Sequence, residues 1–302
     1  MQTRGEGGYR PIRDYGFIGD CHGNALVASD GGIDWCALGR HDAEPVFFRI
    51  LDAGKGGFWS ITPTAETSVE RSYRASTNIL ETTFTTAEGK VRLTDFMPVG
   101  RHVEASAHDY VHLIAPFWLA RRITGLAGNV ELEIRYRPSA GFAAPTVALS
   151  QDGEALRGEG VPALFSQLPF TIEGDMATAQ VTVSAGEAHD LVLAAREVAG
   201  QSPLTRIGEL DAVTEAFWQE WIGYNRYQGP HKEAVRRSAL ALKLLTYAPS
   251  GALVAAATTS LPEELGGGRN WDYRFSWLRD SCFTLYALAG IGYGGEARRF
   301  VD

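Results

Sequence analysis

The sequence has little of what marks a secreted, metal-binding or cofactor-dependent protein. Only three cysteines, Cys21, Cys36 and Cys282, occur among 302 residues, and an odd, small number argues against a disulfide framework. No two cysteines are spaced as CxxC, and no HExxH motif occurs. We therefore predict no metal site, no cofactor, and cysteines that stay reduced, as thiols do in a cytosol.

Basic blocks and long apolar runs are also missing. The net charge is −8 and the isoelectric point is about 5.4, so the sequence does not predict the basic surface that nucleic-acid binding requires. No stretch of about 18 apolar residues is present to span a membrane. The first sixteen residues contain no apolar core of signal-peptide length. These absences predict a cytoplasmic protein that binds neither nucleic acid nor membrane.

The first two thirds of the chain have the pattern of short β-strands separated by turns. From Val130 to Arg137, apolar and charged residues alternate strictly, which indicates a strand with one buried and one wet face. Two apolar runs, 24–28 and 33–38, flank a Ser-Asp-Gly-Gly turn and predict a hairpin. Many strands without intervening helices favour an antiparallel β-sandwich. Further strands are predicted at 58–63, 68–74, 78–86, 90–98, 145–150, 167–173, 177–184 and 189–195.

After Gly200 the apolar period changes from that of strands to that of helices. Ser202 is a candidate helix cap, Pro203 suits a first helical position, and apolar residues then recur at helical spacing up to Trp221. We expect the apolar face of this helix to pack between the sandwich and the helices that follow it. A second helix is predicted over 231–247, with two apolar stripes. A third is predicted over 280–289, so apolar that it would need neighbours on all sides.

Ionisable residues gather near the amino end: Asp20, His22, Asp34, His41 and Asp42. Such a cluster could form a metal or catalytic centre. Asp residues and their neighbours also occur commonly as turn and cap residues, and we favour that interpretation here.

The stretch GRNWDYRFSWLRDSC, residues 268–282, combines aromatic rings with charges in a way that suits a sugar pocket. A pyranose ring presents C–H bonds that stack on aromatic rings and hydroxyls that arginine and carboxylates can bind. We predict that Tyr273 and Trp277 stack on a sugar and that Arg279 and Asp280 bind its hydroxyls. The alternative is that Asp280 caps the following helix while the aromatic rings belong to the core. The residues alone leave both interpretations open.

The segment TTSLPEELGGGRNWDYRFSWLRDS, residues 258–281, resembles the start of the catalytic domain of glycoside hydrolase family 15. Residues 11–52 resemble the start of the β-domain of its prokaryotic members, the trehalase- and glucoamylase-like proteins. The resemblance implies a trehalase-like β-domain over 1–200, a large two-sheet sandwich called a supersandwich. A linker helix follows over 201–229, and the opening helices of an incomplete (α/α)6 barrel over 230–302. The resemblance also implies that Tyr273, Trp277, Arg279 and Asp280 line the subsite for the non-reducing glucose.

The family resemblance further implies inverting hydrolysis of α-glucosidic bonds in trehalose, maltose or a glucan, most closely as in a trehalase. The two catalytic glutamates of the family lie beyond residue 302, so no catalytic residue is assigned and this chain is expected to be inactive alone. Glu263 and Glu264 are adjacent on one loop and are assigned to the surface. Either a homo-oligomer or another chain would then complete the barrel. The alternative function is a non-catalytic carbohydrate-binding or assembly module.

The same resemblance implies that the loop around GRHDAEPVF, residues 39–47, approaches the sugar site. Relatives read nearer PRFDSPSVF at this point, so His41 and Glu44 depart from the family pattern.

Overall fold

A computed structural model describes most of the chain. The described residues are 8–102, 104, 112–143, 146–197, 201–259, 263–264 and 266–301. The predicted boundary at Gly200 lies outside them, as do residues 260–262 and 265 before the aromatic motif. Within these ranges, no helix combines the length and apolar character that a membrane crossing requires.

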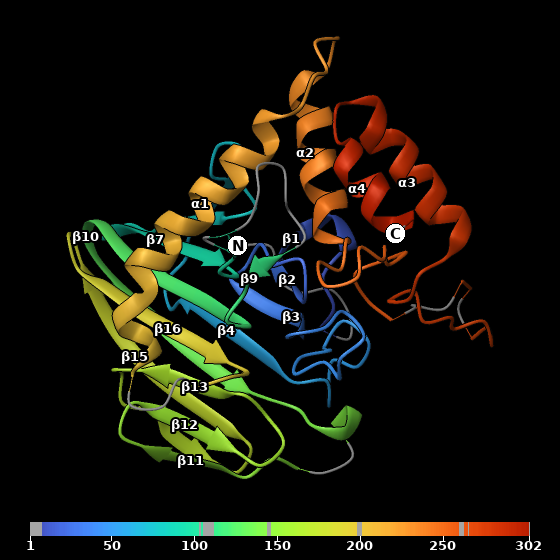
Figure 1. Cartoon of the computed structure of the whole chain (residues 1–302). Coiled ribbons are helices and arrows are strands. Elements are labelled where there is room, and N and C mark those ends of the chain that lie inside the picture. Colours follow the sequence, from blue (N-terminus) through green and yellow to red (C-terminus); the bar gives the residue numbers. More distant parts are fainter. Residues whose placement is uncertain are drawn as a thin grey trace.

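The strands come first and the helices follow (Figure 1). The strands up to residue 114 are β1 Tyr15–Gly19, β2 Asn24–Ala28, β3 Gly32–Ala37, β4 Phe58–Pro63, β5 Ser68–Tyr73, β6 Leu80–Thr85, β7 Gly89–Phe96, β8 Gly100–Arg101 and β9 Leu113–Ile114. The later strands are β10 Trp118–Arg137, β11 Leu149–Asp152, β12 Ala155–Gly158, β13 Ala163–Ser166, β14 Thr171–Glu173, β15 Met176–Ser184 and β16 Ala188–Ala194. The helices are α1 Ile207–Gly223, α2 Lys232–Leu244, α3 Leu278–Gly290 and α4 Gly294–Val301, with short 3-10 turns at Ile12–Asp14, Gly141–Ala143 and Pro203–Arg206.

Fourteen of the described strands form one large antiparallel sheet, and β8 pairs with β9 separately. The sheet has two arms: β1–β4, β14 and β15 form one with the second half of β10, and β5–β7, β11–β13 and β16 form the other with its first half. The longest path through the sheet runs β1-β2-β3-β4-β10-β16-β13-β12-β11. β5, β6 and β7 branch from β10 on one side, and β15 and β14 branch from it on another. A large antiparallel sheet followed by a few helices confirms the predicted order of a β region and then an α region.

Strand β10 is the element that joins the two arms. Its first part, Trp118–Thr124, pairs with β16, and residues 120–128 pair with β7. Its second part pairs with β15 from Asn129 and with β4 from Leu132. One twenty-residue strand therefore belongs to both arms and changes partners at its middle. Strands that pass from one sheet to another in this way usually bend at a bulge or glycine.

Two glycines make this change of partners possible. The pairing between β10 and β7 shifts between Gly125 and Ala127. Gly128 follows with φ +57°, a left-handed conformation that costs glycine little. A Cβ atom on Gly125 would lie 1.9 Å from the carbonyl oxygen of Ser184. The bend of β10 thus requires a residue without a side chain at Gly125.

Replacing Gly125 with alanine should therefore destabilise the fold by about 1–3 kcal/mol, the usual cost of forcing an atom into a filled space. Urea unfolding at equilibrium would measure the change. Gly223 at the end of α1 provides a control, because a Cβ there meets no atom within 4 Å and its backbone is not left-handed. If Gly125→Ala and Gly223→Ala unfold at the same urea concentration, the steric argument is wrong.

The predicted hairpin and most predicted strands are present. β2 and β3 pair across the turn, and β15 and β16 match 177–184 and 189–195 within one residue. Val130, Leu132, Ile134 and Tyr136 are buried, as their alternation indicates. The first half of β10 went unpredicted, as did the short strands β1, β8, β9, β12 and β13.

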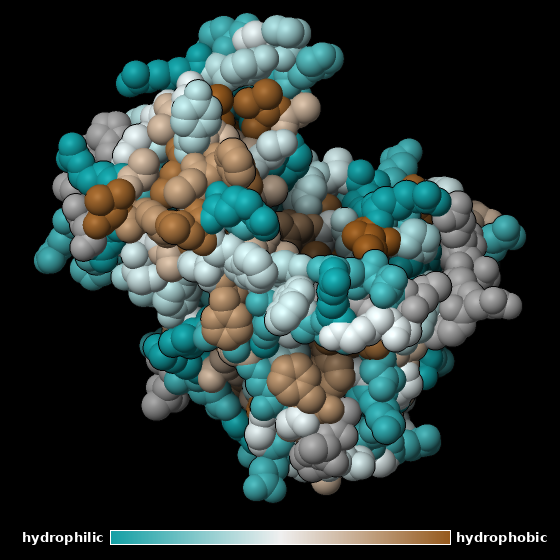
Figure 2. Space-filling view, turned by 90° about the vertical axis from the view of Figure 1, so that its right-hand side faces the viewer, coloured by the Kyte–Doolittle hydropathy of each residue, from teal (hydrophilic) through white to brown (hydrophobic). Residues whose placement is uncertain are grey.

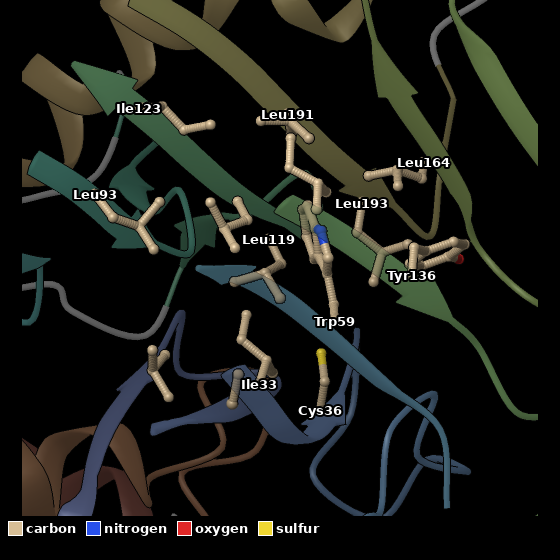
Figure 3. Packing of buried hydrophobic residues seen from close by; sticks show 14 of the residues in the cluster. Ile33, Cys36, Trp59, Leu93, Leu119, Ile123, Tyr136, Leu164, Leu191 and Leu193 are labelled. Carbon is tan, nitrogen blue, oxygen red and sulfur yellow. The ribbon is translucent and has the colours of Figure 1, made fainter. Parts of the chain in front are cut away.

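The core of the β region lies where the two arms face each other (Figure 3). Trp59 of β4, Leu119 of β10 and Leu191 of β16 point toward one another in the centre, and all three are buried. Leu93 of β7 and Tyr136 of β10 extend the same cluster. Because these side chains come from strands of both arms, their burial holds the arms together.

Helix α1 bridges the sheet and the other helices, as predicted. Ile207 at its start packs with Phe96, Trp118 and other residues of the strands. Trp218 and Trp221 at its end pack with residues of α2 and α3. Ser202 occupies the N-cap position of the 3-10 turn Pro203–Arg206, with Pro203 at its start, as predicted. It forms no side-chain capping hydrogen bond, and its hydroxyl instead donates to a carboxylate oxygen of Glu154 at 2.7 Å.

Helix α3 is much less covered than its apolar sequence predicts. Among its residues only Ser281 and Leu288 are buried, while Leu278, Phe283 and Tyr286 are 69–82% exposed. Figure 2 views the molecule from the side on which α3 lies in Figure 1, and apolar side chains gather over the helical part. The expectation of neighbours on all sides is therefore not met within the described residues.

Candidate functional site

The aromatic motif is attached by hydrogen bonds to the segment that precedes it. The amide of Ala255 donates to the carbonyl of Phe275 at 3.1 Å, and that of Ala256 donates to the carbonyl of Tyr273 at 2.9 Å. The Ser276 hydroxyl donates to the carbonyl of Leu253 at 2.8 Å. Residues 273–276 therefore run as a bent loop alongside residues 253–256, and α3 starts at Leu278.

The four predicted sugar-binding residues lie in a continuous row along this loop and the first turn of α3. The rings of Tyr273 and Trp277 are 5.4 Å apart between centroids and tilted by 31°. The guanidinium carbon of Arg279 lies 5.9 Å from the centre of the Trp277 ring. Arg279 Nη2 is in turn 3.3 Å from Asp280 Oδ2. The Arg279 side chain is 70% exposed and that of Asp280 is 38% exposed, so the pair is not enclosed in a dry interior.

Asp280 is not a helix cap, which corrects the alternative interpretation of this residue. The residue in the N-cap position of α3 is Trp277, and no side chain caps the helix there. Asp280 lies in the first turn, where the helix dipole favours a carboxylate. Its Oδ2 atom receives no hydrogen bond from any described residue, despite the nearby Arg279. Asp280 thus carries a buried acceptor oxygen that has no hydrogen-bond donor among the described residues.

Arg274 is a residue of this region whose contacts the sequence interpretation missed. Its guanidinium forms hydrogen bonds with both carboxylate oxygens of Asp272 and donates to the Ala43 carbonyl at 2.6 Å. Partial burial alone would raise the pKa of Asp272, but the hydrogen bonds from Arg274 outweigh it and lower that pKa. Arg274 therefore connects the aromatic motif to the 39–47 loop of the β region. No sequence pattern indicated this contact, because Arg274 and Ala43 lie more than 200 positions apart.

Four of the five ionisable residues near the amino end are buried, and Asp42 is partly exposed. Asp20 stabilises a turn as expected, since its Oδ1 accepts from the amides of His22 and Gly23 at 2.9 and 2.7 Å. Burial raises the pKa of Asp20. His22 and His41 are 6% and 2% exposed, and both lie edge-on to Tyr247. In the part of the chain that the structure describes, no three His, Cys, Asp or Glu side chains are grouped to hold a metal ion.

A cavity of about 230 Å³ opens between the 40–42 loop and the helical part. Its walls come from the 40–42 loop of the β region and from the segments 247–254 and 274–276 of the helical part. The lining residues are Arg40, His41, Asp42, Tyr247, Ser250, Ala252, Val254, Arg274, Phe275 and Ser276. The implied approach of the 39–47 loop to the aromatic motif is thus seen at its Arg274–Ser276 segment.

Two protein families match adjoining parts of the chain. The family described as "Trehalase-like, N-terminal" matches residues 5–216, and the family "Glycosyl hydrolases family 15" matches residues 229–302. The first match covers the strands and most of α1, and the second covers the aromatic motif with α2, α3 and α4.

Curated relatives agree with both matches. A trehalase of Thermoplasma volcanium is 34% identical over 97% of this chain and 47% of its own length. A trehalase of Mycolicibacterium smegmatis is 33% identical over 97% of this chain and 46% of its own length. A trehalase of Thermoplasma acidophilum is 35% identical over 91% of this chain and 47% of its own length. The chain thus spans about half the length of these relatives. With both family matches in sequence order, the chain belongs to the trehalase-like proteins of glycosyl hydrolase family 15.

Proposed function

We propose that the protein to which this chain belongs hydrolyses α-glucosidic bonds with inversion, with trehalose as the first candidate substrate and maltose or a glucan as the others. The row Tyr273, Trp277, Arg279 and Asp280 carries the proposal. The names of the relatives, each called a trehalase, support trehalose over the other substrates.

In this proposal the row binds the non-reducing glucose. The tilted rings of Tyr273 and Trp277 offer an apolar surface to the C–H face of the sugar. Arg279 is exposed enough to donate to hydroxyls, and Asp280 Oδ2 is an acceptor without a donor. Because Arg279 Nη2 lies only 3.3 Å from Asp280 Oδ2, the exposed Arg279 side chain would turn aside on binding. One glucose hydroxyl would then donate to Asp280, and another would accept from Arg279.

We further propose that the two arms of the sheet form the supersandwich of the family and that α2, α3 and α4 open its (α/α)6 barrel. The domains would then be 1–200, 201–229 and 230–302. The exposed apolar face of α3 supports this, because a barrel helix needs packed neighbours. Further helices of the same protein or a second chain would cover that face.

Catalysis by this chain alone is not expected. Inversion needs a carboxylic acid and a carboxylate roughly 6.5–9.5 Å apart on opposite faces of the sugar. The described carboxylates around the row are already paired: Asp272 with Arg274, Asp280 with Arg279 and Glu263 with Arg269. Glu264 is exposed on the same loop as Glu263. We therefore propose that this chain binds glucose units and that the acid and base are supplied elsewhere.

Titration calorimetry of this chain with glucose and trehalose tests the binding step. Asp280→Ala should weaken binding about tenfold or more, the loss that follows from one hydrogen bond to a charged group. Asp152→Ala, an exposed carboxylate on β11, is the matched control and should change nothing. Equal affinity of Asp280→Ala and the parent chain would rule out this site. Glucose release that disappears in Asp280→Ala would instead show that the chain is active alone.

A second candidate function is a non-catalytic carbohydrate-binding or assembly module. The pairing of Glu263, Asp272 and Asp280 with arginines favours it for this chain taken alone. We propose the cytoplasm as the compartment, because Cys21, Cys36 and Cys282 are free thiols.

A further inference from the structure

The cavity between the 40–42 loop and the helical part contains a buried hydrogen-bond donor with no partner. His41 lines this cavity and is only 2% exposed. Its Nε2 atom is buried and forms no hydrogen bond with any described residue. Buried polar groups are nearly always hydrogen-bonded, so an unpartnered one beside a cavity indicates that something can bind there.

A chain of hydrogen bonds determines which nitrogen of His41 carries the proton. Trp35 Nε1 can only donate, and it lies 2.9 Å from Asn24 Oδ1. This contact orients the Asn24 amide so that its Nδ2 donates to His41 Nδ1 at 3.0 Å. His41 Nδ1 must therefore accept, and the proton of the neutral ring resides on Nε2. With Nδ1 turned to Asn24, the Nε2–H group is the buried donor of this cavity-lining residue that has no partner among the described residues.

The cavity wall carries charges, but each is neutralised by a neighbour. Arg40 forms two hydrogen bonds of 2.8 Å with Asp42, and Arg274 is held by Asp272. Burial, with the nearby His22, lowers the pKa of His41 to about 4, so its ring is neutral at physiological pH. An anion would find no uncompensated cation among these residues. A neutral ligand with hydroxyl groups would find the Nε2–H donor and the rings of Tyr247 and Phe275.

We propose that this cavity is a second sugar site, in which His41 Nε2–H donates to an oxygen of a neutral hexose. The rings of Tyr247 and Phe275 provide the apolar surface, and the volume of about 230 Å³ suits a single ring. None of the four residues of the row lines this cavity, but Phe275 and Ser276, which lie between Tyr273 and Trp277 in the chain, do. Only the choice of glucose as the hexose rests on the proposed function.

Nuclear magnetic resonance of this chain with 15N-labelled histidine tests the proposal in two parts. In the free protein, His41 should show the neutral form protonated at Nε2. Added glucose should shift the Nε2 resonance of His41 saturably, both in the parent chain and in Asp280→Ala. Inorganic phosphate at the same concentration should not shift it. Trehalose tests whether a ring joined to a second glucose is also accepted.

Variants separate the donor from the shape of the ring, with the backbone amide of Ser276 as the reporter. His41→Phe keeps a ring but removes the donor, and should weaken glucose binding about tenfold, the loss of one hydrogen bond. His41→Gln keeps an N–H group near the same position and should lose less. His189→Phe, a histidine on β16 away from this cavity, should bind as the parent does.

Each other outcome overturns the proposal. Protonation at Nδ1, or a His41 resonance that phosphate moves, would show that the site is not one for neutral sugars. If glucose shifts resonances that depend on Asp280 but leaves His41 unmoved, the proposed function stands and this second site does not. If glucose shifts no resonance at all, both fall together.

Discussion

Replacing Arg121 with leucine is expected to destabilise the chain by about 3–5 kcal/mol, the cost of leaving a buried charge without its partner. Arg121 and Asp95 are both completely buried, and Arg121 Nε lies 2.7 Å from Asp95 Oδ1. The same guanidinium donates to the carbonyls of Trp59 at 3.0 Å and Gly31 at 2.7 Å. A leucine would leave the buried Asp95 carboxylate without its cation and remove a donor from the carbonyls of Trp59 and Gly31, of which Gly31 keeps the amide of Ile61 as a donor.

The neighbouring residue provides the control for this experiment. Arg122 forms an equally short pair with Asp190, at 2.7 Å, but both side chains are more than 20% exposed. Arg122→Leu should therefore cost about 0.2–1 kcal/mol, as partly solvated ion pairs do. Urea unfolding of both variants measures the difference. If Arg121→Leu and Arg122→Leu lose the same free energy of unfolding, burial of the Arg121–Asp95 pair is not what makes Arg121 important.

The loss caused by Arg121→Leu should depend on pH. Burial raises the pKa of Asp95, and Arg121 counteracts that rise through its charge and hydrogen bond. Without Arg121 the pKa of Asp95 rises further, so the folded state takes up a proton at pH values where the unfolded state does not. Stability of the variant then falls as pH rises from the unfolded value near 3.9 through the folded one. The gap to the parent chain should narrow as pH is lowered toward about 4.5, and a constant gap would contradict this account.

The second large effect is expected at Lys243, the buried lysine of α2. Its side chain is 1% exposed, and its Nζ lies 3.4 Å from Glu296 Oε1 of α4. Trp221 of α1 donates to the same oxygen at 2.8 Å and stacks on Tyr293 at 4.1 Å. Lys243→Met would leave the Glu296 carboxylate buried without a cation, at a cost of about 3–5 kcal/mol.

A double variant distinguishes the lost charge from lost packing. Lys243→Met with Glu296→Gln removes both charges but keeps an oxygen that accepts from Trp221, so most of the loss should be recovered. Lys232→Met, at the start of α2, should change stability by less than about 0.5 kcal/mol because its ammonium bonds only to the exposed side chain of Gln228. The free energy of unfolding of all three variants can be measured by urea unfolding, with tryptophan fluorescence as the signal. Failure of the double variant to recover would mean that packing, not charge, explains the loss.

Sequence periodicity predicted the strands that have one wet face, and it failed where a strand has charges inside. Val130–Arg137 alternates clearly and is the second half of β10. The first half holds Arg121, whose charge is buried, and ends in glycines that resemble a turn. Lys243 could not be predicted as buried either. Its partner Glu296 is distant in sequence, and helical spacing places a lysine on the wet face by default.

The four residues of the candidate site could be named from the sequence, but their surroundings could not. Tyr273, Trp277, Arg279 and Asp280 fall in one row because the loop of the aromatic motif runs directly into α3. What sequence reasoning could not supply is the contact of Arg274 with Ala43, or the burial of His41 against Tyr247. Both join residues more than 200 positions apart, and only the packed chain brings them together.

The place of β10 in both arms has a consequence for synthesis on the ribosome. Its partners β4 and β7 precede it, whereas β15 and β16 follow it and end at Ser184 and Ala194. Translation adds roughly 5–20 residues each second, so β10 waits several seconds for its later partners. During that interval the edges of β10 carry unpaired amides and carbonyls. The nascent chain is then most exposed to wrong pairing, and a chaperone that shields extended segments would matter most at that stage.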